Sequence, residues 1–372
     1  MRQRNNILDY GRALAIIYMI SVHLGFTIVN TTLIFAMPIL FFISGYNYTV
    51  GKTSFKEFAK RRAKRLVIPF FICEIVFGIL EIFRSNYYGY GDWRVIYAVM
   101  THMIYGSGKT PGTAPWAYKI YQILSYKPQP TNYIDISVPS VVHLWFLPVM
   151  FTASLIFYLI IERVHNKKGL FIGTVIILCA AAGFETIPDM WELPWGLGRA
   201  FFATALMMIG YAAKESGFFE KKNPGNVLSS VAVSAVFVIV AYMLGSNARS
   251  LNDAYYGPYP FLSVYVTLIG AIGGICIVLQ LMRLFDAYAP EVCKKAFSLI
   301  GVESMSVYTM HLLILFSTDI LFFEITKEAF APDPFYFITV STEHWVFKLC
   351  QLILSIAILV TIPRLLRKKT QH

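Results

Sequence analysis

Charged residues are scarce in this chain, and no polar stretch is long enough to form a soluble domain. Only 14% of the 372 residues are Asp, Glu, Lys or Arg, whereas 57% are hydrophobic. The mean hydropathy is +0.59. These values exclude a soluble globular protein of ordinary composition and are typical of an integral membrane protein.

Several motifs of soluble enzymes are also absent. The chain has no Walker A loop, no Rossmann glycine fingerprint, no HExxH and no two histidines four residues apart. It has no GxSxG elbow of a serine hydrolase. The five cysteines form no CxxC pair and lie in or beside apolar runs, so we expect thiols rather than disulfides. We therefore expect no metal and no bound cofactor.

The net charge of +11 does not indicate binding to nucleic acid, because the basic residues cluster between the hydrophobic runs. Positively charged loops on one side of a membrane explain this pattern. The lipid bilayer is the expected partner.

Ten apolar runs have the length of a membrane span. They predict an all-α membrane protein, a single domain over 1–372 built as a bundle of about ten transmembrane helices. The lysines and arginines fall in the loops that share a side with both termini, so we expect both termini to be cytoplasmic. Residues 85–141 then form a long extracytoplasmic loop. The runs are 9–28, 33–50, 66–84, 142–161, 170–185, 197–213, 226–244, 261–285, 298–318 and 345–363.

The first run contains two ionisable side chains, Arg12 and His23, eleven positions apart. At about 100° per residue they point in the same direction, and at 1.5 Å per residue they stand roughly 16 Å apart along the helix. Ionisable groups at membrane depth suggest function by default. His23 is a candidate general base or a histidine hydrogen-bonded between helices. Arg12 is a candidate phosphate or carboxylate ligand or a side chain that snorkels to the membrane surface. Asp9, one turn earlier, is placed to orient Arg12 by a salt bridge or is only a favourable acid in the first turn of a helix.

A basic cluster precedes the third run. Arg62 and Arg65 share a helix face, and with Arg61 they offer guanidinium groups that suit the phosphates of a nucleotide; a cluster that only sets membrane topology has the same composition. In the second run, Ser44-Gly45 permits close approach of a helix or a ligand.

Further candidates lie in later runs, each with a structural alternative. His143 and Trp145 open the fourth run on the outer side, as acceptor-binding groups or as part of an aromatic belt. Tyr308 and His311 share a helical stripe with Ser304, as a substrate wall or an interhelical network. Glu74 and Glu81 share one face of the third run, where either can neutralise an arginine or orient an imidazole.

These segments together resemble the acyltransferase-3 family of integral membrane O-acyltransferases. The motifs that carry the resemblance occur in order over 9–311, and the match covers essentially the whole chain in a stand-alone form without a fused esterase-like domain. They are Asp9-x-x-Arg12 with Arg12-x10-His23, Pro38-x-x-Phe41-Phe42-x-Ser44-Gly45, Arg62-x-x-Arg65 before Pro69, His143-x-Trp145-Phe146-Leu147, and Ser304-x-x-x-Tyr308-x-x-His311.

The resemblance implies transfer of an acyl group, most often acetyl, from cytoplasmic acyl-CoA to a hydroxyl of a cell-surface or lipid-linked carbohydrate. Acyl-CoA is then the donor substrate and the carbohydrate the acceptor, in a multi-pass protein of a bacterial inner or plasma membrane. A homo-oligomer is compatible with the sequence. The alternative is a polytopic transporter or flippase for an anionic solute or glycan precursor, but the chain lacks the two related halves with broken spans that many transporters have.

Overall fold

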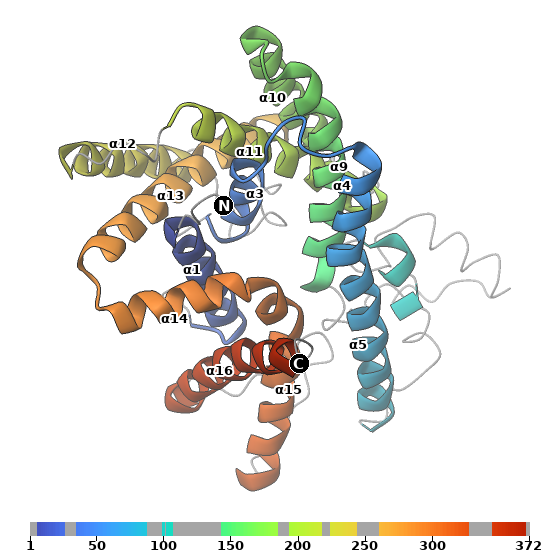
Figure 1. Ribbon diagram of the computed structural model, residues 1–372. Helices are drawn as coiled ribbons and strands as arrows, with labels where there is room; N and C mark the ends of the chain where they lie inside the picture. Colours follow the sequence, from blue (N-terminus) through green and yellow to red (C-terminus); the bar gives the residue numbers. More distant parts are fainter. Residues whose placement is uncertain are drawn as a thin grey trace, which may run out of the picture.

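All regular secondary structure that the structure describes is helical (Figure 1). The computed structural model describes residues 6–26, 35–87, 99–100, 102–106, 143–184, 193–217, 224–243, 260–326 and 344–369. Most of the long loop predicted over 85–141 therefore lies outside the described residues, and the single-domain organisation stays a prediction.

The helices follow the order of the apolar runs. They are α1 (Asn6–His23), α3 (Ala36–Tyr46), α4 (Phe55–Arg62), the π-helix η1 (Ala63–Val67), α5 (Ile68–Tyr87), the 3₁₀-helix η3 (His143–Trp145), α9 (Phe146–Val164), α10 (Lys168–Gly183), the 3₁₀-helix η5 (Pro194–Gly196), α11 (Leu197–Glu215), α12 (Pro224–Met243), α13 (Pro260–Tyr288), α14 (Glu291–Val302), α15 (Ser304–Thr326) and α16 (Trp345–Lys369).

Helices overlap all ten predicted runs, so the prediction of an all-helical membrane protein is confirmed for the described residues, whereas the number of ten spans stays a prediction. Among the described residues, five helical stretches are long and apolar enough to cross a membrane, and three shorter apolar helices accompany them. The five are Phe146–Val164, Pro194–Glu215, Leu262–Tyr288, Ser304–Thr326 and Trp345–Leu365, and the shorter three are Ala36–Tyr46, Lys168–Gly183 and Ser230–Ala241.

Two boundaries differ from the predicted ones for local reasons. The first run was expected to be helical to residue 28, but α1 ends at His23, because Gly25 adopts a left-handed conformation with φ 75° that terminates a helix. The run at 298–318 is divided at Glu303, between α14 and α15. The hydropathy of the sequence reveals neither the end of α1 at His23 nor the division at Glu303.

The short helix α3 packs between α1 and α11 near the centre of the bundle (Figure 1). Glycines make this contact close. A Cβ atom added to Gly45 would lie 1.8 Å from the backbone oxygen of Met207, and one added to Gly210 would lie 2.1 Å from that of Phe42. The two helices therefore meet backbone to backbone, which fixes α3 and the Ser44 side chain next to Gly45.

The helix that leads into α5 contains a π-turn between Arg62 and Ile68. The N–H of Ile68 bonds to the carbonyl of Ala63, five residues earlier. Pro69 has no N–H to bond the carbonyl of Arg65, so the regular α-helical pattern cannot continue here. The π-turn therefore changes the directions in which the basic side chains point, compared with an ideal α-helix.

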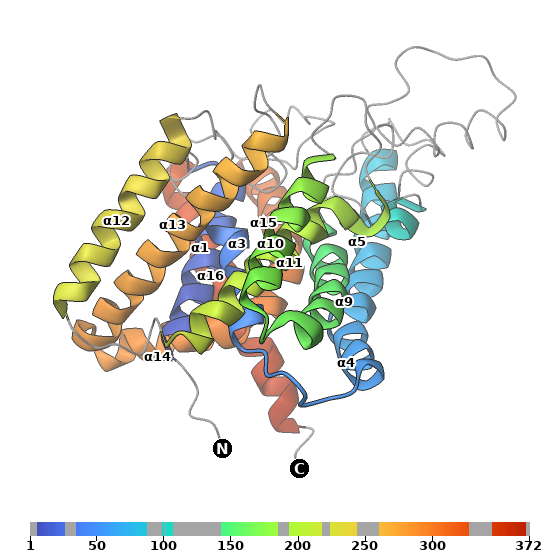
Figure 2. The ribbon, with the colours of Figure 1, turned by 90° about the horizontal axis from the view of Figure 1, so that it is seen from above.

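Helix ends that carry basic residues gather at one end of the bundle. Figure 2 shows that α1 begins at the end where α4 and α14 lie and where α16 finishes. The arginines of α4 and η1 and Arg12 in α1 therefore belong to the same region.

The contact between α3 and α11 predicts a large stability difference between two glycine substitutions. Gly45→Ala forces a methyl group against backbone that cannot rotate away, so we expect a loss of about 1–3 kcal/mol or more. Gly173 in α10 has open space around it, and Gly173→Ala should be neutral or slightly stabilising. Thermal unfolding of both variants in detergent measures the difference, and equal melting temperatures would contradict the close packing.

Candidate functional site

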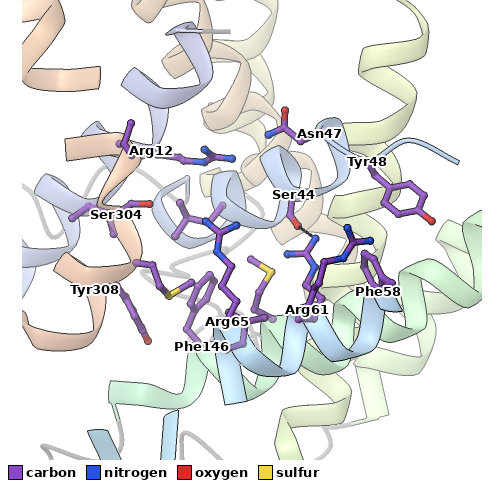
Figure 3. Close-up of a pocket in the computed structure, with 18 of the residues that line it drawn as sticks. Arg12, Ser44, Asn47, Tyr48, Phe58, Arg61, Arg65, Phe146, Ser304 and Tyr308 are labelled. Atoms are coloured by element: carbon purple, nitrogen blue, oxygen red, sulfur yellow. Dashed lines mark hydrogen bonds between the residues drawn. The ribbon is translucent and has the colours of Figure 1, made fainter. Parts of the chain in front are cut away.

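A cavity of about 580 Å³ opens between α1, α3, α4, α9 and α15, in the range typical of small-molecule sites (Figure 3). It combines residues far apart in the sequence with the loop between α3 and α4. Its described lining consists of Arg12, Ile16, Leu40, Ser44, Asn47, Tyr48, Thr49, Lys52, Thr53, Phe58, Arg61, Arg62, Arg65, Leu66, Phe146, Met150, Gly301, Val302, Ser304, Met305 and Tyr308.

The lining of this cavity is strongly cationic. Four arginines and Lys52 are among its described lining residues, and none of those residues is Asp or Glu. Burial and the neighbouring Arg65 and Arg12 lower the pKa of Arg62 to about 10. Arg62 stays protonated at neutral pH, and an anion that enters the cavity relieves its repulsion by the other cations.

Specific contacts orient two of the arginines. Arg12 Nη1 donates to Asp9 Oδ1 at 3.1 Å, the salt bridge that the sequence suggested for Asp9. Arg62 Nη2 donates to Ser44 Oγ at 3.0 Å (Figure 3), and its guanidinium lies 5.2 Å from the centre of the Phe58 ring. These contacts restrict the side chains before any ligand binds, which reduces the entropy that binding must overcome.

Glu162, at the end of α9, holds the loop at the mouth of the cavity. Its Oε1 accepts a hydrogen bond from the Tyr48 hydroxyl at 2.6 Å and from the Gly51 amide at 3.0 Å. Burial and this carboxylate raise the pKa of the Tyr48 hydroxyl, which therefore stays a donor. Lys214 Nζ donates to the Tyr48 carbonyl at 2.6 Å. The loop is thus bonded to both α9 and α11.

Aromatic rings connect the cavity wall to His23. Phe146 and Tyr308 line the cavity with ring centres 5.1 Å apart. The Tyr308 ring is 6.2 Å from that of His311, and the His311 ring is 5.2 Å from that of His23. His23 is not among the residues that line the cavity, so Tyr308 and His311 connect it to the arginine-rich space.

A hydrogen bond orients the ring of His311. Its Nδ1 lies 2.7 Å from the Tyr308 carbonyl. A carbonyl oxygen only accepts hydrogen bonds, so Nδ1 is the donor in this contact. His311 is almost fully buried, and its ring lies beside that of His23.

The structure brings most of the sequence-predicted residues together. Arg12, Arg61, Arg62, Arg65, Ser44 and Tyr308 line the cavity, Asp9 holds Arg12, and His311 contacts His23. Glu74 lies elsewhere, in a buried pair with His102, whose Nδ1 is 3.1 Å from Glu74 Oε1. Glu74 therefore has one of its two expected roles, that of orienting an imidazole. The imidazole belongs to His102, which no sequence motif had indicated.

Three candidates remain outside this group. Trp145 is 7% exposed, and its ring lies 5.4 Å from the guanidinium of Arg199. The side chains of His143 and Glu81 are outside the described residues, so their roles stay predictions.

The sequence did not indicate the residues of the loop between α3 and α4 that line the cavity, or the side chains that bond to this loop. Tyr48 lies at the end of the second apolar run, and Lys52 and Glu162 lie in the polar segments that follow apolar runs. No motif distinguishes these residues. Arg199 was also missed, although a lone arginine at the start of an apolar helix is a detectable signal.

The fold and the cavity define a multi-pass helical membrane protein with a cationic internal site beside two histidines. The family model described as an acyltransferase domain matches residues 5–362. The chain therefore belongs to the acyltransferase-3 family, and it is a membrane acyltransferase by class. No match was found among curated proteins or among solved structures.

The charge of the cavity predicts that a polyanion stabilises the protein. Adding millimolar pyrophosphate should raise the melting temperature of the wild type, because a ligand that binds only the folded state stabilises it. Arg62→Met should weaken binding about 10- to 100-fold, since a charged hydrogen bond contributes about 1.5–3 kcal/mol. Arg163→Met, at an exposed arginine that bonds to the Leu159 carbonyl outside the cavity, is the matched control. An equal shift in all three proteins would contradict an anion site at Arg62.

Proposed function

We propose that this protein is a membrane O-acyltransferase that moves an acyl group, most simply acetyl, from cytoplasmic acyl-CoA to a hydroxyl of a cell-surface or lipid-linked carbohydrate. One observation carries the proposal: four guanidinium groups line the cavity, and the ring of its lining residue Tyr308 contacts His311, whose ring lies 5.2 Å from that of His23. A donor with a polyanionic head and a long uncharged arm ending in a reactive group fits such a cavity.

The membrane arrangement belongs to the same proposal. About ten spans with both termini in the cytoplasm put the beginning of α1, α4 and their arginines at the cytoplasmic surface. The phosphates of coenzyme A bind Arg12, Arg61, Arg62 and Arg65 there. The roughly 16 Å from Arg12 to His23 along α1 is a distance that the pantetheine arm can cover. The acceptor approaches from the outer side, near His143 and Trp145, in a bacterial inner or plasma membrane.

His23 has one of two roles in the transfer. As a general base it takes the proton of the acceptor hydroxyl while the oxygen attacks the thioester carbonyl; coenzyme A leaves as the thiolate and takes that proton to become the thiol. As a nucleophile it first accepts the acyl group, with release of the thiol, and then passes the group to the hydroxyl. Both routes yield one ester and one thiol.

The proposal predicts loss of transfer in His23→Ala. Membranes with matched amounts of each protein receive acetyl-CoA labelled in the acetyl group, and label in extractable glycan and release of the thiol are followed. The wild type should transfer label, and His23→Ala should lose at least about 10²-fold, as expected for a general base. His165→Ala, at a histidine that bonds to the Ile161 carbonyl and lies outside the cavity, should keep wild-type activity.

The outcomes separate the alternatives. Full transfer by His23→Ala would overturn the role of His23. Release of no thiol by the wild type, together with uptake of an anionic solute or a glycan precursor, would favour the transporter. Label that accumulates on the protein in a single turnover without acceptor would identify the acyl-histidine route.

A further inference from the structure

α1 ends in a hydrogen-bonded turn immediately after His23. The amide of Gly25 bonds to the carbonyl of Val22 at 3.0 Å, and the amide of Phe26 bonds to that of Ser21 at 3.2 Å. With Gly25 left-handed, this is a Schellman motif. His23 is the last helical residue, so the direction of its imidazole depends on how firmly this turn is held.

A buried lysine from the far end of the sequence bonds to this turn. Lys348 Nζ donates to the carbonyl of Leu24 at 2.7 Å, and Lys348 is 4% exposed. It extends from α16, 324 positions away from Leu24. A cation is favourable at the carbonyl end of a helix, where the backbone dipoles leave partial negative charge.

A buried polar network lies next to Lys348. Asp319 in α15 interacts with the ammonium group electrostatically, and Asp319 Oδ1 accepts a hydrogen bond from Gln351 Nε2 at 2.6 Å. Gln351 Nε2 also donates to Thr318 Oγ1 at 2.8 Å. The three residues are buried and lie within helices apolar enough to span a membrane. Ionisable groups at this depth are costly, and apolar residues of similar volume would hold α15 and α16 together at lower cost.

The placement of the network connects it to His23. α15 carries both Asp319 and, eight residues earlier, His311, whose ring is 5.2 Å from that of His23. α16 supplies the bond to the residue that follows His23. The two helices that Gln351 joins are therefore the ones that contact the ring of His23 and the turn behind it.

We propose that Lys348, with Asp319 as its counter-charge, is a positioning residue for His23. By bonding to the Leu24 carbonyl it fixes the end of α1 and thereby the direction of the imidazole, without touching the donor or the acceptor. The inference rests on the proposed function for its effect on rate, but the effect on the end of α1 is independent of that function.

The first test is Lys348→Met, which keeps a linear side chain and removes the ammonium group. We expect kcat of acetyl transfer to fall about 10- to 100-fold, since misplacing a reacting group by about 1 Å has an effect of that order. The KM for acetyl-CoA should not change, because Arg12 near the start of α1 and the arginines of α4 and η1 are far from Lys348 in the fold. Lys348→Arg keeps the charge and a donor and should restore much of kcat. Ser355→Ala, which removes a buried polar atom from the same helix, should behave as the wild type.

A second measurement needs no enzymatic activity. Diethylpyrocarbonate modifies accessible imidazoles, and peptide mass spectrometry gives the rate at each histidine. In Lys348→Met the rate at His23 should rise several-fold while the rate at His165 stays constant. If Lys348→Met does not fold, Asp319→Asn takes its place, because the amide still accepts from Gln351 while Lys348 loses its counter-charge.

The outcomes distinguish the two proposals. Absence of transfer by the wild type counts against the proposed function and leaves the modification rates to decide the role of Lys348. Wild-type kcat and an unchanged His23 rate in the folded variant would overturn the positioning role and leave the proposed function intact.

Discussion

Five cationic side chains share one cavity, and none of its described lining residues is acidic. Like charges repel most where the surroundings are least polar, so this arrangement requires rigid support. Asp9 holds Arg12, Ser44 and Phe58 hold Arg62, and Glu162 holds the loop above them. The packing of α3 on α11 serves the same purpose, because it fixes the helix from which Ser44 extends. Much of the fold around the cavity can be understood as the support of a site that attracts anions.

The first helix, α1, connects the cationic cavity to the surroundings of His23. Arg12 near its start belongs to the cationic space, and His23 at its end belongs to a polar environment made by α15 and α16. α1 is a single uninterrupted helix between them, so their separation is set by backbone geometry. The helix therefore holds a guanidinium group near one end and an imidazole at the other at a fixed separation.

Hydropathy predicted the helices well, because burial in a membrane requires long apolar runs whatever their partners are. It misplaced the end of α1 and overlooked the break at Glu303, which depend on a left-handed glycine and on local packing. The arginines were recognised as a group because their spacing in the sequence already puts them on neighbouring turns. Tyr48, Glu162 and Lys348 were not recognised, since each acts through a contact more than 100 positions away.

The sequence by itself therefore determined the helical membrane class, the family and the residues with the most evident chemistry, since periodicity, charge and motif spacing are local properties of the chain. The tertiary structure decided which of those residues meet. It placed Glu74 with His102 instead of an arginine, buried Trp145 beside Arg199, and brought His311 and Lys348 to the end of α1. These contacts join segments that are distant in the sequence, and only helix packing, which depends on side chains from several helices at once, fixes them.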